Sequence, residues 1–267
     1  MLSCNDLFNL SNASDAGIFD GLSFPWEALP GIKEYVLSRL DRTGVTKIRQ
    51  DGEVLRKTCV LYQGEVLTDH LHFEPGDVTK GRFKVYYRDD LLVGASVVYA
   101  GACLFDNDIT LGTGVVVEPG ALIKGPTMIG DFSEVRQGAY IRGNCLVGRS
   151  CVVGHVTEIK NAVMLDQAKA GHFAYIGDSI LGRDTNLGAG TKLANLKFIP
   201  GPTRIQVGGE VHLVNLHKFG AILGDYVQTG CNSVTNPGTV LGRRSLVGPN
   251  ETVASGYYPP HSIILTG

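Results

Sequence analysis

Aliphatic residues recur at every sixth position through the middle of the chain. From Leu111 to Leu165, ten successive positions of this series are Leu, Val or Ile. The position four residues later is small at nearly every step, as at Ala121, Ser133 and Ala139. A period of six fits neither an α-helix of 3.6 residues per turn nor an alternating strand. It predicts a solenoid of short strands and turns, in which three units close a triangular coil of about 18 residues.

The series continues beyond this stretch, with interruptions. It resumes after a slip between Leu165 and Tyr175, breaks again over residues 194–220 and then restarts. The aliphatic residues would fill the interior of each coil, while glycine would supply turns that need positive φ. We therefore expect a mainly β fold, with a β-helix over residues 86–256.

The ends of the chain do not repeat. In residues 1–85, apolar residues spaced as one helix face run from Ile32 to Leu40, and short strand-like runs follow as far as Phe73. We expect residues 1–85 to form a small α/β cap and residues 257–267 to form a C-terminal tail.

The interruption at residues 194–220 has its own pattern. Arg204 to Leu213 alternates around Gly208-Gly209, which predicts a β-hairpin. A long insertion in a regular coil is more often functional than structural. We expect this one to be able to reach over the site of a neighbouring subunit.

Composition narrows the class of protein. The net charge of -2 and the 19% of charged residues give no sign of a nucleic-acid partner or of binding to an anionic membrane. No apolar run reaches the roughly 18 residues of a membrane-spanning helix, and the N-terminus lacks the basic region of a signal peptide. The six cysteines form no C-x-x-C pair, so we expect reduced thiols in the cytoplasm, with Cys145 and Cys151 as buried fillers.

The slip in the repeat contains a candidate for chemistry, His172, in Lys169-Ala170-Gly171-His172. Acyl transfer from a thioester to an amine needs a group that accepts a proton, and the pKa of histidine suits that task. It also needs donors for the oxyanion, which backbone N–H groups of Gly-rich turns or an Asn amide can supply. The alternative is that His172 is simply a satisfied polar residue.

Three runs of residues carry a family resemblance that covers roughly residues 111–253. These runs are Glu158-Ile159-Lys160-Asn161, Ala170-Gly171-His172-Phe173-Ala174-Tyr175-Ile176-Gly177-Asp178 and Asn186-Leu187-Gly188-Ala189-Gly190-Thr191. They resemble the acetyltransferase domain of the bifunctional N-acetylglucosamine-1-phosphate uridylyltransferase/glucosamine-1-phosphate acetyltransferase. Ala194-Asn195-Leu196-Lys197-Phe198 and Lys218-Phe219-Gly220-Ala221-Ile222-Leu223-Gly224 are similar to the archaeal sugar-1-phosphate nucleotidylyltransferase/acetyltransferases.

The resemblance implies a left-handed β-helix, a homotrimer with active sites between subunits, acetyl-CoA as co-substrate and an amino-sugar phosphate as acceptor. It also implies a role for each matched residue. The catalytic pair would be His172, as general base, and Asn186. The phosphate would be held by Arg142 and Lys160, and the sugar would be oriented by Tyr175 and Asn195, together with Asn186. The acetyl-CoA channel would be lined by Ala189 and Cys231. A phosphate dianion favours an Arg fork and a Lys point charge.

The chain departs from that family in several places. Leu196 replaces a Tyr of the bacterial enzymes, the lysine beyond it has no counterpart unless Arg204 substitutes, and the tail lacks the arginine near CoA. The Gly-rich nucleotide loop is missing and residues 1–85 are too few for its domain, so we expect no nucleotidyltransferase activity. His70 and His72 are too few alone for a metal site, so we expect no metal.

Two other functions remain open at this stage. The acyl acceptor could be another amine, such as a nucleotide-linked amino sugar. Alternatively, the β-helix could be a non-catalytic scaffold or a sugar-nucleotide sensor.

Overall fold

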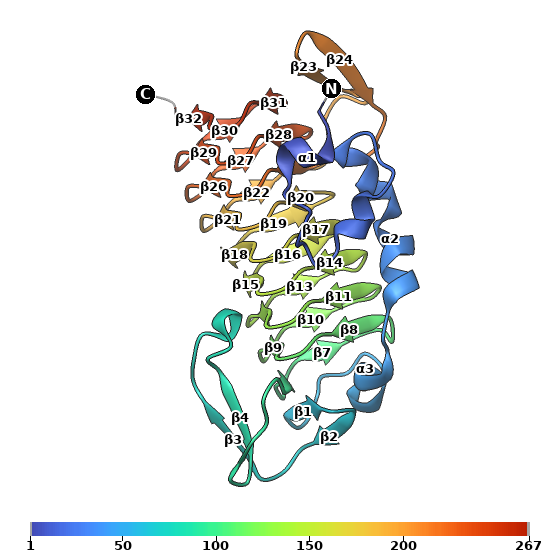
Figure 1. The fold of residues 1–267 in the computed structure, drawn as a ribbon, viewed down its shortest axis with the longest axis vertical. Helices are drawn as coiled ribbons and strands as arrows, with labels where there is room; N and C mark the ends of the chain where they lie inside the picture. Colours follow the sequence, from blue (N-terminus) through green and yellow to red (C-terminus); the bar gives the residue numbers. More distant parts are fainter. Residues whose placement is uncertain (1, 266–267) are drawn as a thin grey trace.

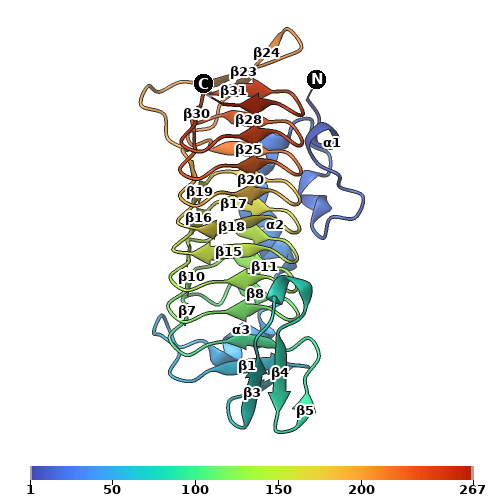
Figure 2. The ribbon, with the colours of Figure 1, turned by 90° about the vertical axis from the view of Figure 1, so that its left-hand side faces the viewer.

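Stacked triangular coils form a long column in the computed structural model, which describes residues 2–265 (Figures 1 and 2). The column is a left-handed parallel β-helix with three flat faces. Among the described residues, nine parallel strands form face I and eight form each of faces II and III. The fold predicted from the six-residue period is therefore confirmed.

The strands of each face follow one another along the column. Face I contains β6 (Ser96–Val98), β9 (Val116–Val117), β12 (Glu134–Val135), β15 (Val152–His155), β18 (Lys169–His172), β21 (Asn186–Leu187), β26 (Gln228–Thr229), β29 (Leu246–Val247) and β32 (Ile263–Ile264). Face II contains β7 (Cys103–Leu104), β10 (Leu122–Ile123), β13 (Tyr140–Ile141), β16 (Glu158–Lys160), β19 (Tyr175–Gly177), β22 (Lys192–Leu193), β27 (Val234–Thr235) and β30 (Thr252–Val253). Face III contains β8 (Ile109–Leu111), β11 (Thr127–Ile129), β14 (Cys145–Val147), β17 (Ala162–Met164), β20 (Ile180–Leu181), β25 (Ala221–Leu223), β28 (Thr239–Leu241) and β31 (Gly256–Tyr258).

The interior is a stack of the predicted aliphatic residues. Val117, Val135 and Val153 pair in register on successive strands of face I, and all three side chains are fully buried. Cys145 and Cys151 are buried in the same core, where burial raises the pKa of each thiol to about 12. The prediction that these two cysteines are inert fillers therefore fits their surroundings.

The phase of the repeat differs from the prediction at the slip. The interior residue after Ile159 is Met164, whereas Leu165 packs outside the coil, under the N-terminal segment. The coil therefore shortens by one residue before Leu165, and Ile176 instead of Tyr175 points inward. The six-residue pattern placed Leu165 inside the coil because Leu165 is also buried, although on the outer side of the coil. As a result, Tyr175 is available on the outside of face II.

The N-terminal segment lies along face III (Figure 1). It contains α1 (Cys4–Leu7), η1 (Ala16–Phe19), η2 (Pro25–Glu27) and α2 (Ala28–Arg39). Leu7, Phe8 and Ile32 are fully buried against outward-facing side chains of face III such as Ile222. The expected helix thus exists, but residues 2–40 line a face of the column and do not cap its end.

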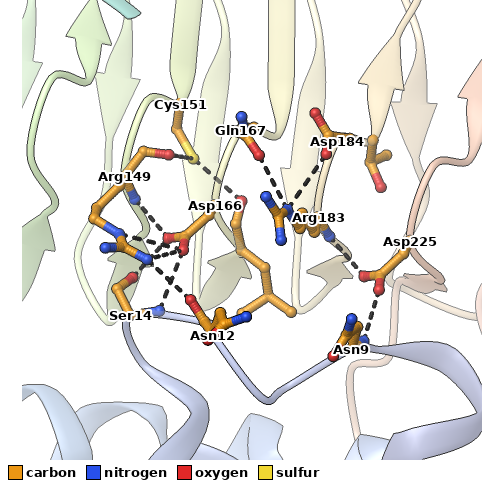
Figure 3. A network of polar contacts seen from close by, with 12 residues as sticks. Asn9, Asn12, Ser14, Arg149, Cys151, Asp166, Gln167, Arg183, Asp184 and Asp225 are labelled. Carbon is orange, nitrogen blue, oxygen red and sulfur yellow. Dashed lines mark hydrogen bonds and ion pairs between the residues drawn. The ribbon is translucent and has the colours of Figure 1, made fainter.

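Polar bonds hold the same segment to the corner between faces III and I (Figure 3). The Ser14 hydroxyl donates to Asp166 (2.6 Å), and the backbone N–H of Asn9 donates to Asp225 (2.6 Å). Arg149 pairs with Asp166 (2.9 Å) and also donates to the carbonyl of Asn12. These bonds fix the path of the segment along the corner.

The next residues close one end of the column. These are α3 (Thr43–Ile48), β1 (Cys59–Tyr62) and β2 (Glu65–Leu67), and β1 pairs antiparallel with β6 of the first coil. A three-stranded extension then projects from the column, made of β3 (Leu71–Glu74), β4 (Lys84–Tyr87) and β5 (Asp90–Leu91). Its loop contains the short helix η3 (Val78–Lys80) and lies beside the column in Figures 1 and 2.

The predicted hairpin is present as β23 (Thr203–Val207) and β24 (Glu210–Val214). In this chain it packs on the N-terminal segment, because the ring of His212 lies 4.8 Å from that of Phe24 and Ile205 is buried in the same cluster as Trp26. The coil also continues past residue 256 through β31 and β32, into the expected tail. Residues 266 and 267 of that tail lie outside the described residues.

Candidate active site

His172 lies at the end of β18, on the corner between faces I and II. Its carbonyl accepts a hydrogen bond from the backbone N–H of Gly190 (3.0 Å), which fixes the turn to the next coil. Its side chain is exposed and is not sealed inside the coil. The imidazole is therefore free to meet a substrate at this edge.

Backbone strain marks the same corner. Phe173, next to His172, has φ of 52°, and the equivalent residue one coil earlier, Val156, has φ of 50°. This region of φ is rare for bulky and β-branched residues. Both side chains are also about half exposed, at 53% and 51%. The same left-handed backbone recurs at other turns of the column, for example at Phe132 and Tyr226, so it is the exposure of these two apolar side chains that distinguishes the corner.

A groove of about 630 Å³ runs along face I beside His172. We call it the face-I groove. It brings together four of the predicted site residues, which are His172, Asn186, Ala189 and Cys231. The cysteine among them is exposed, unlike the five other cysteines.

A glycine gives the face-I groove its open floor. Gly171 directly precedes His172, and a side chain added at Gly171 would meet nothing within 4 Å. By contrast, a Cβ at Gly154 of the previous coil would lie 1.9 Å from the backbone oxygen of Gly171. The two glycines therefore have different roles. Gly171 leaves room for a ligand, whereas Gly154 lets two successive coils approach each other.

Charged residues that sequence reasoning missed also line the face-I groove. Arg136 pairs with Glu134 (3.0 Å), and Lys169 lies nearby on β18. Asp77 comes from the η3 loop, where hydrogen bonds from Thr79 and Lys80 lower the pKa of its carboxyl to about 2. The alternation along face I could have indicated Arg136 and Lys169, but only the tertiary fold brings Asp77 here.

The other predicted residues lie on face II or at its edge, across the corner from the groove. Arg142 donates to Glu158 (2.7 Å), and Tyr175 stands in register between Glu158 and Lys192 on the outer surface of face II. Lys192, which sequence reasoning missed, donates to the carbonyl of Gly190. Face II thus presents an aromatic ring among several charged groups.

Asp178 joins two of the predicted residues. Its carboxylate accepts hydrogen bonds from Lys160 (3.0 Å) and from the side-chain amide of Asn195 (2.5 Å). Asp178 and Asn195 are buried, with 6% and 8% of their surfaces exposed. Gly177 makes room for this arrangement, since a Cβ there would come within 2.6 Å of both the Asn195 amide nitrogen and the Tyr175 hydroxyl. The motif contained Asp178, but nothing in the sequence assigned it a role.

The predicted residues therefore form two groups on either side of one corner. His172, Asn186, Ala189 and Cys231 line the face-I groove, while Arg142, Lys160, Tyr175 and Asn195 belong to face II and its edge. His172 belongs to both surfaces, because it ends a strand of face I and lies three residues before Tyr175 of face II. Lys160 and Asn195 lie at the other edge of face II, at its corner with face III.

Known proteins share this part of the chain. The family model of the GMPPB C-terminal domain matches residues 123–247. The bifunctional protein GlmU of Methanococcus vannielii is 39% identical over 98 residues, which is 37% of this chain and 23% of that protein. The bifunctional sugar-1-phosphate nucleotidylyltransferase/acetyltransferase of Sulfurisphaera tokodaii is 35% identical over 101 residues, 38% of this chain and 25% of that protein. About a hundred residues of this chain are thus similar to parts of these bifunctional proteins.

The resemblance inferred from the motifs is thus confirmed. The matched stretch spans about a quarter of the length of these curated relatives. Among solved structures, the Arabidopsis UDP-N-acetylglucosamine acyltransferase aligns with a TM-score of 0.40 and 13% identity, over 63% of this chain and 68% of that chain.

Two further observations concern residues 2–265. No group of three or more His, Cys, Asp or Glu side chains among them is placed to hold a metal ion. None of their helices has the length and apolar character needed to cross a membrane.

Proposed function

We propose that this protein is a CoA-dependent acyltransferase that moves an acetyl group from acetyl-CoA to the amine of an amino-sugar 1-phosphate. The observation that carries the proposal is the position of His172, on the corner between the face-I groove and the residues of face II. Sequence similarity to a bifunctional sugar-1-phosphate nucleotidylyltransferase/acetyltransferase over 101 residues supports it.

In this proposal the face-I groove takes acetyl-CoA. Its floor at Gly171 is open, and Ala189 and Cys231 continue the wall beyond His172. Face II takes the acceptor: Arg142 and Lys160 hold the phosphate, while Tyr175 and Asn195 orient the sugar. Both cations already contact carboxylates, and each keeps further N–H donors for the phosphate oxygens.

The reaction then needs few groups. The acceptor amine attacks the thioester carbonyl, and His172 takes a proton from the nitrogen as the C–N bond forms. The oxyanion of the tetrahedral intermediate is stabilised by N–H donors of the turn at Ala189 and by the amide of Asn186. The C–S bond breaks, the amide product forms, and CoA leaves as a thiol with the proton that His172 carried.

We also propose that three copies of the chain assemble around the faces that the N-terminal segment leaves free. That segment covers face III, whereas the half-exposed Val156 and Phe173 lie at the corner beside His172. A second copy at this corner would close the face-I groove and exclude water from the thioester.

Replacing the proposed base tests the mechanism. His172→Ala should lower the rate of thiol release from acetyl-CoA by about 10²–10⁴-fold, because the amine loses its proton acceptor. His155 is a matched control, since it pairs with His172 in register one coil earlier and its Nδ1 lies 3.0 Å from the carbonyl of Gln137. His155→Ala should keep most of the activity. An unchanged rate in His172→Ala would remove His172 from its role.

A panel of acceptors tests the substrate class. The amine of an amino-sugar 1-phosphate should support faster thiol release than the unphosphorylated sugar, because face II carries Arg142 and Lys160. A nucleotide-linked amino sugar is the third member of the panel. Faster turnover of the nucleotide-linked sugar would mean that this sugar is the acceptor, and the proposed acyl transfer reaction would stand. A stable trimer that binds no CoA in calorimetry would favour a scaffold over an enzyme.

A further inference from the structure

We propose that Asp178 is a positioning residue, whose buried carboxylate orients Asn195 and Lys160 toward the acceptor and holds the start of the 194–220 insertion at Asn195. The inference rests on the proposed function, in which Asn195 and Lys160 contact the acceptor sugar phosphate. Asp178 itself would touch no substrate, because both of its carboxylate oxygens already accept hydrogen bonds from Lys160, Asn161 and Asn195.

Three side chains converge on this one carboxylate. Lys160 donates to both of its oxygens (3.0 and 3.3 Å), Asn161 donates to Oδ1 (3.0 Å) and Asn195 donates to Oδ2 (2.5 Å). Lys160 and Asn161 belong to the coil below, and Asn195 belongs to the coil above. The carboxylate therefore links three successive coils at the corner between faces II and III.

The backbone of Asp178 fixes the insertion as well. Its carbonyl accepts a hydrogen bond from Gly220 (2.8 Å), where the chain returns to the coil. The carbonyl of Asn195, where the chain leaves the coil, accepts one from Phe219 (3.0 Å). Both ends of the excursion are thus bonded at or beside Asp178, whose own backbone lies in the left-handed region with φ of 47°.

The chemistry of a carboxylate decides which way the Asn195 amide points. An ionised Asp only accepts hydrogen bonds, so only the NH₂ end of Asn195 can face it. The amide oxygen Oδ1 is then left for a donor, and a sugar hydroxyl or the acceptor nitrogen is such a donor. In the same way, Lys160 uses part of its ammonium on Asp178 and keeps the remaining N–H donors for a phosphate.

Asp178→Asn keeps the shape of the side chain and removes this control. The new amide has one oxygen to share among three donors, so Asn195 is free to turn over and Lys160 loses its anchor. We expect the KM for the amino-sugar acceptor to rise by about 10- to 100-fold, on the order of the effect of one lost buried hydrogen bond. The KM for acetyl-CoA should stay within about twofold of the wild-type value, because the face-I groove does not include Asp178.

Asp166→Asn is a matched control. Asp166 has the same exposure of 6%, and its partner cation lies at 2.9 Å, compared with 3.0 Å for Asp178. It lies on another corner of the column, against the N-terminal segment (Figure 3). A general loss of stability would affect both variants, whereas the positioning role predicts a change in the acceptor KM for Asp178→Asn alone.

A second measurement does not depend on turnover. Hydrogen exchange followed by mass spectrometry should show faster exchange of peptides at the start of the insertion, from Asn195 onward, in Asp178→Asn than in Asp166→Asn or the wild type. Unchanged exchange, or equal rises in the KM of both substrates, would overturn the inference. If exchange rises as expected but the wild-type protein acetylates no amine, the proposed function fails while the positioning role of Asp178 stands.

Asn195→Ala keeps the test possible if Asp178→Asn does not fold. It should raise the acceptor KM without changing the acetyl-CoA KM, and it should increase exchange at the start of the insertion. Where both variants fold, the double variant should have an acceptor KM close to that of Asp178→Asn, because the two side chains act as one unit. Fully additive effects on KM would contradict the inference.

Discussion

Single positions of the coil face either a neighbouring coil or open space, and glycine occurs at both kinds of position. A Cβ at Gly171 would point into the face-I groove, and a Cβ at Gly154 would strike the backbone of the next coil. Neither residue has positive φ, so the difference between them is one of space and not of backbone conformation.

Gly171→Ala should therefore fold as the wild type does and still impair the proposed acetyl transfer. The added methyl group occupies the groove floor beside His172, so we expect the KM for acetyl-CoA to rise severalfold while the melting temperature stays within about 2 °C. Gly154→Ala should instead lower the melting temperature clearly, since a backbone contact of 1.9 Å must be relieved. Kinetics and thermal melts of both variants check this, and an unaltered KM in Gly171→Ala would mean that acetyl-CoA binds elsewhere.

At the scale of elements, the N-terminal segment and the column are joined by apolar packing and by buried carboxylates. Burial alone would raise the pKa of Asp166, but hydrogen bonds from Arg149 and Ser14 outweigh it and lower that pKa below 3.8. Burial raises the pKa of Asp225 above 3.8, despite the N–H donors of Asn9 and Arg183. The two carboxylates therefore respond to acid in opposite ways.

The lowered pKa of Asp166 fixes the sign of its pH dependence. Its contribution to the free energy of unfolding is complete above the unfolded value of about 3.8, and it is lost as the pH falls through the lower folded value. We expect Asp166→Asn to cost about 1–3 kcal/mol at pH 7 and less as the pH drops below about 3.8. Urea unfolding of both proteins at a series of pH values measures this difference. A cost that grows toward acid pH would contradict the assigned pKa direction.

The insertion and the extension show how elements outside the repeat shape the site. The η3 loop of the extension brings Asp77 and Thr79 to the face-I groove, although these residues lie far from His172 in sequence. The insertion leaves the coil at Asn195, and its hairpin packs on the N-terminal segment. The repeat therefore supplies the wall, and the irregular segments supply part of the lining.

At the scale of the whole molecule, the fold bears on how copies of the chain assemble. Phe173 combines a strained φ of 52° with an exposed aromatic ring, and a partner subunit that buries the ring would offset that strain. We expect mass measurement in solution to give three copies of the wild-type chain.

Phe173→Asn tests the same contact. Asn tolerates positive φ better than Phe, so the coil should remain intact by circular dichroism. The apolar contact between subunits would be lost, so the mass should shift toward one copy and the acetyl transfer rate should fall. A trimer with normal activity would show that Phe173 lies outside the interface.

The sequence by itself determined the column. Residues at a six-residue spacing must share one environment when the chain coils three units per turn, so Val117, Val135 and Val153 could be placed in the core without coordinates. The motif around His172 likewise supplied candidate residues, which the structure distributes over face I and face II. These features are local in sequence, and for that reason a repeat or a motif can express them.

Only the tertiary structure decided which side of the wall each ambiguous residue faces and which distant groups meet. Leu165 is buried outside the coil and Met164 inside it, and hydrophobicity alone cannot distinguish two kinds of burial. The place of the N-terminal segment along face III and the approach of Asp77 to the groove depend on packing between segments that are far apart in the chain. Such contacts produce no repeating pattern in the sequence, because each of them occurs only once.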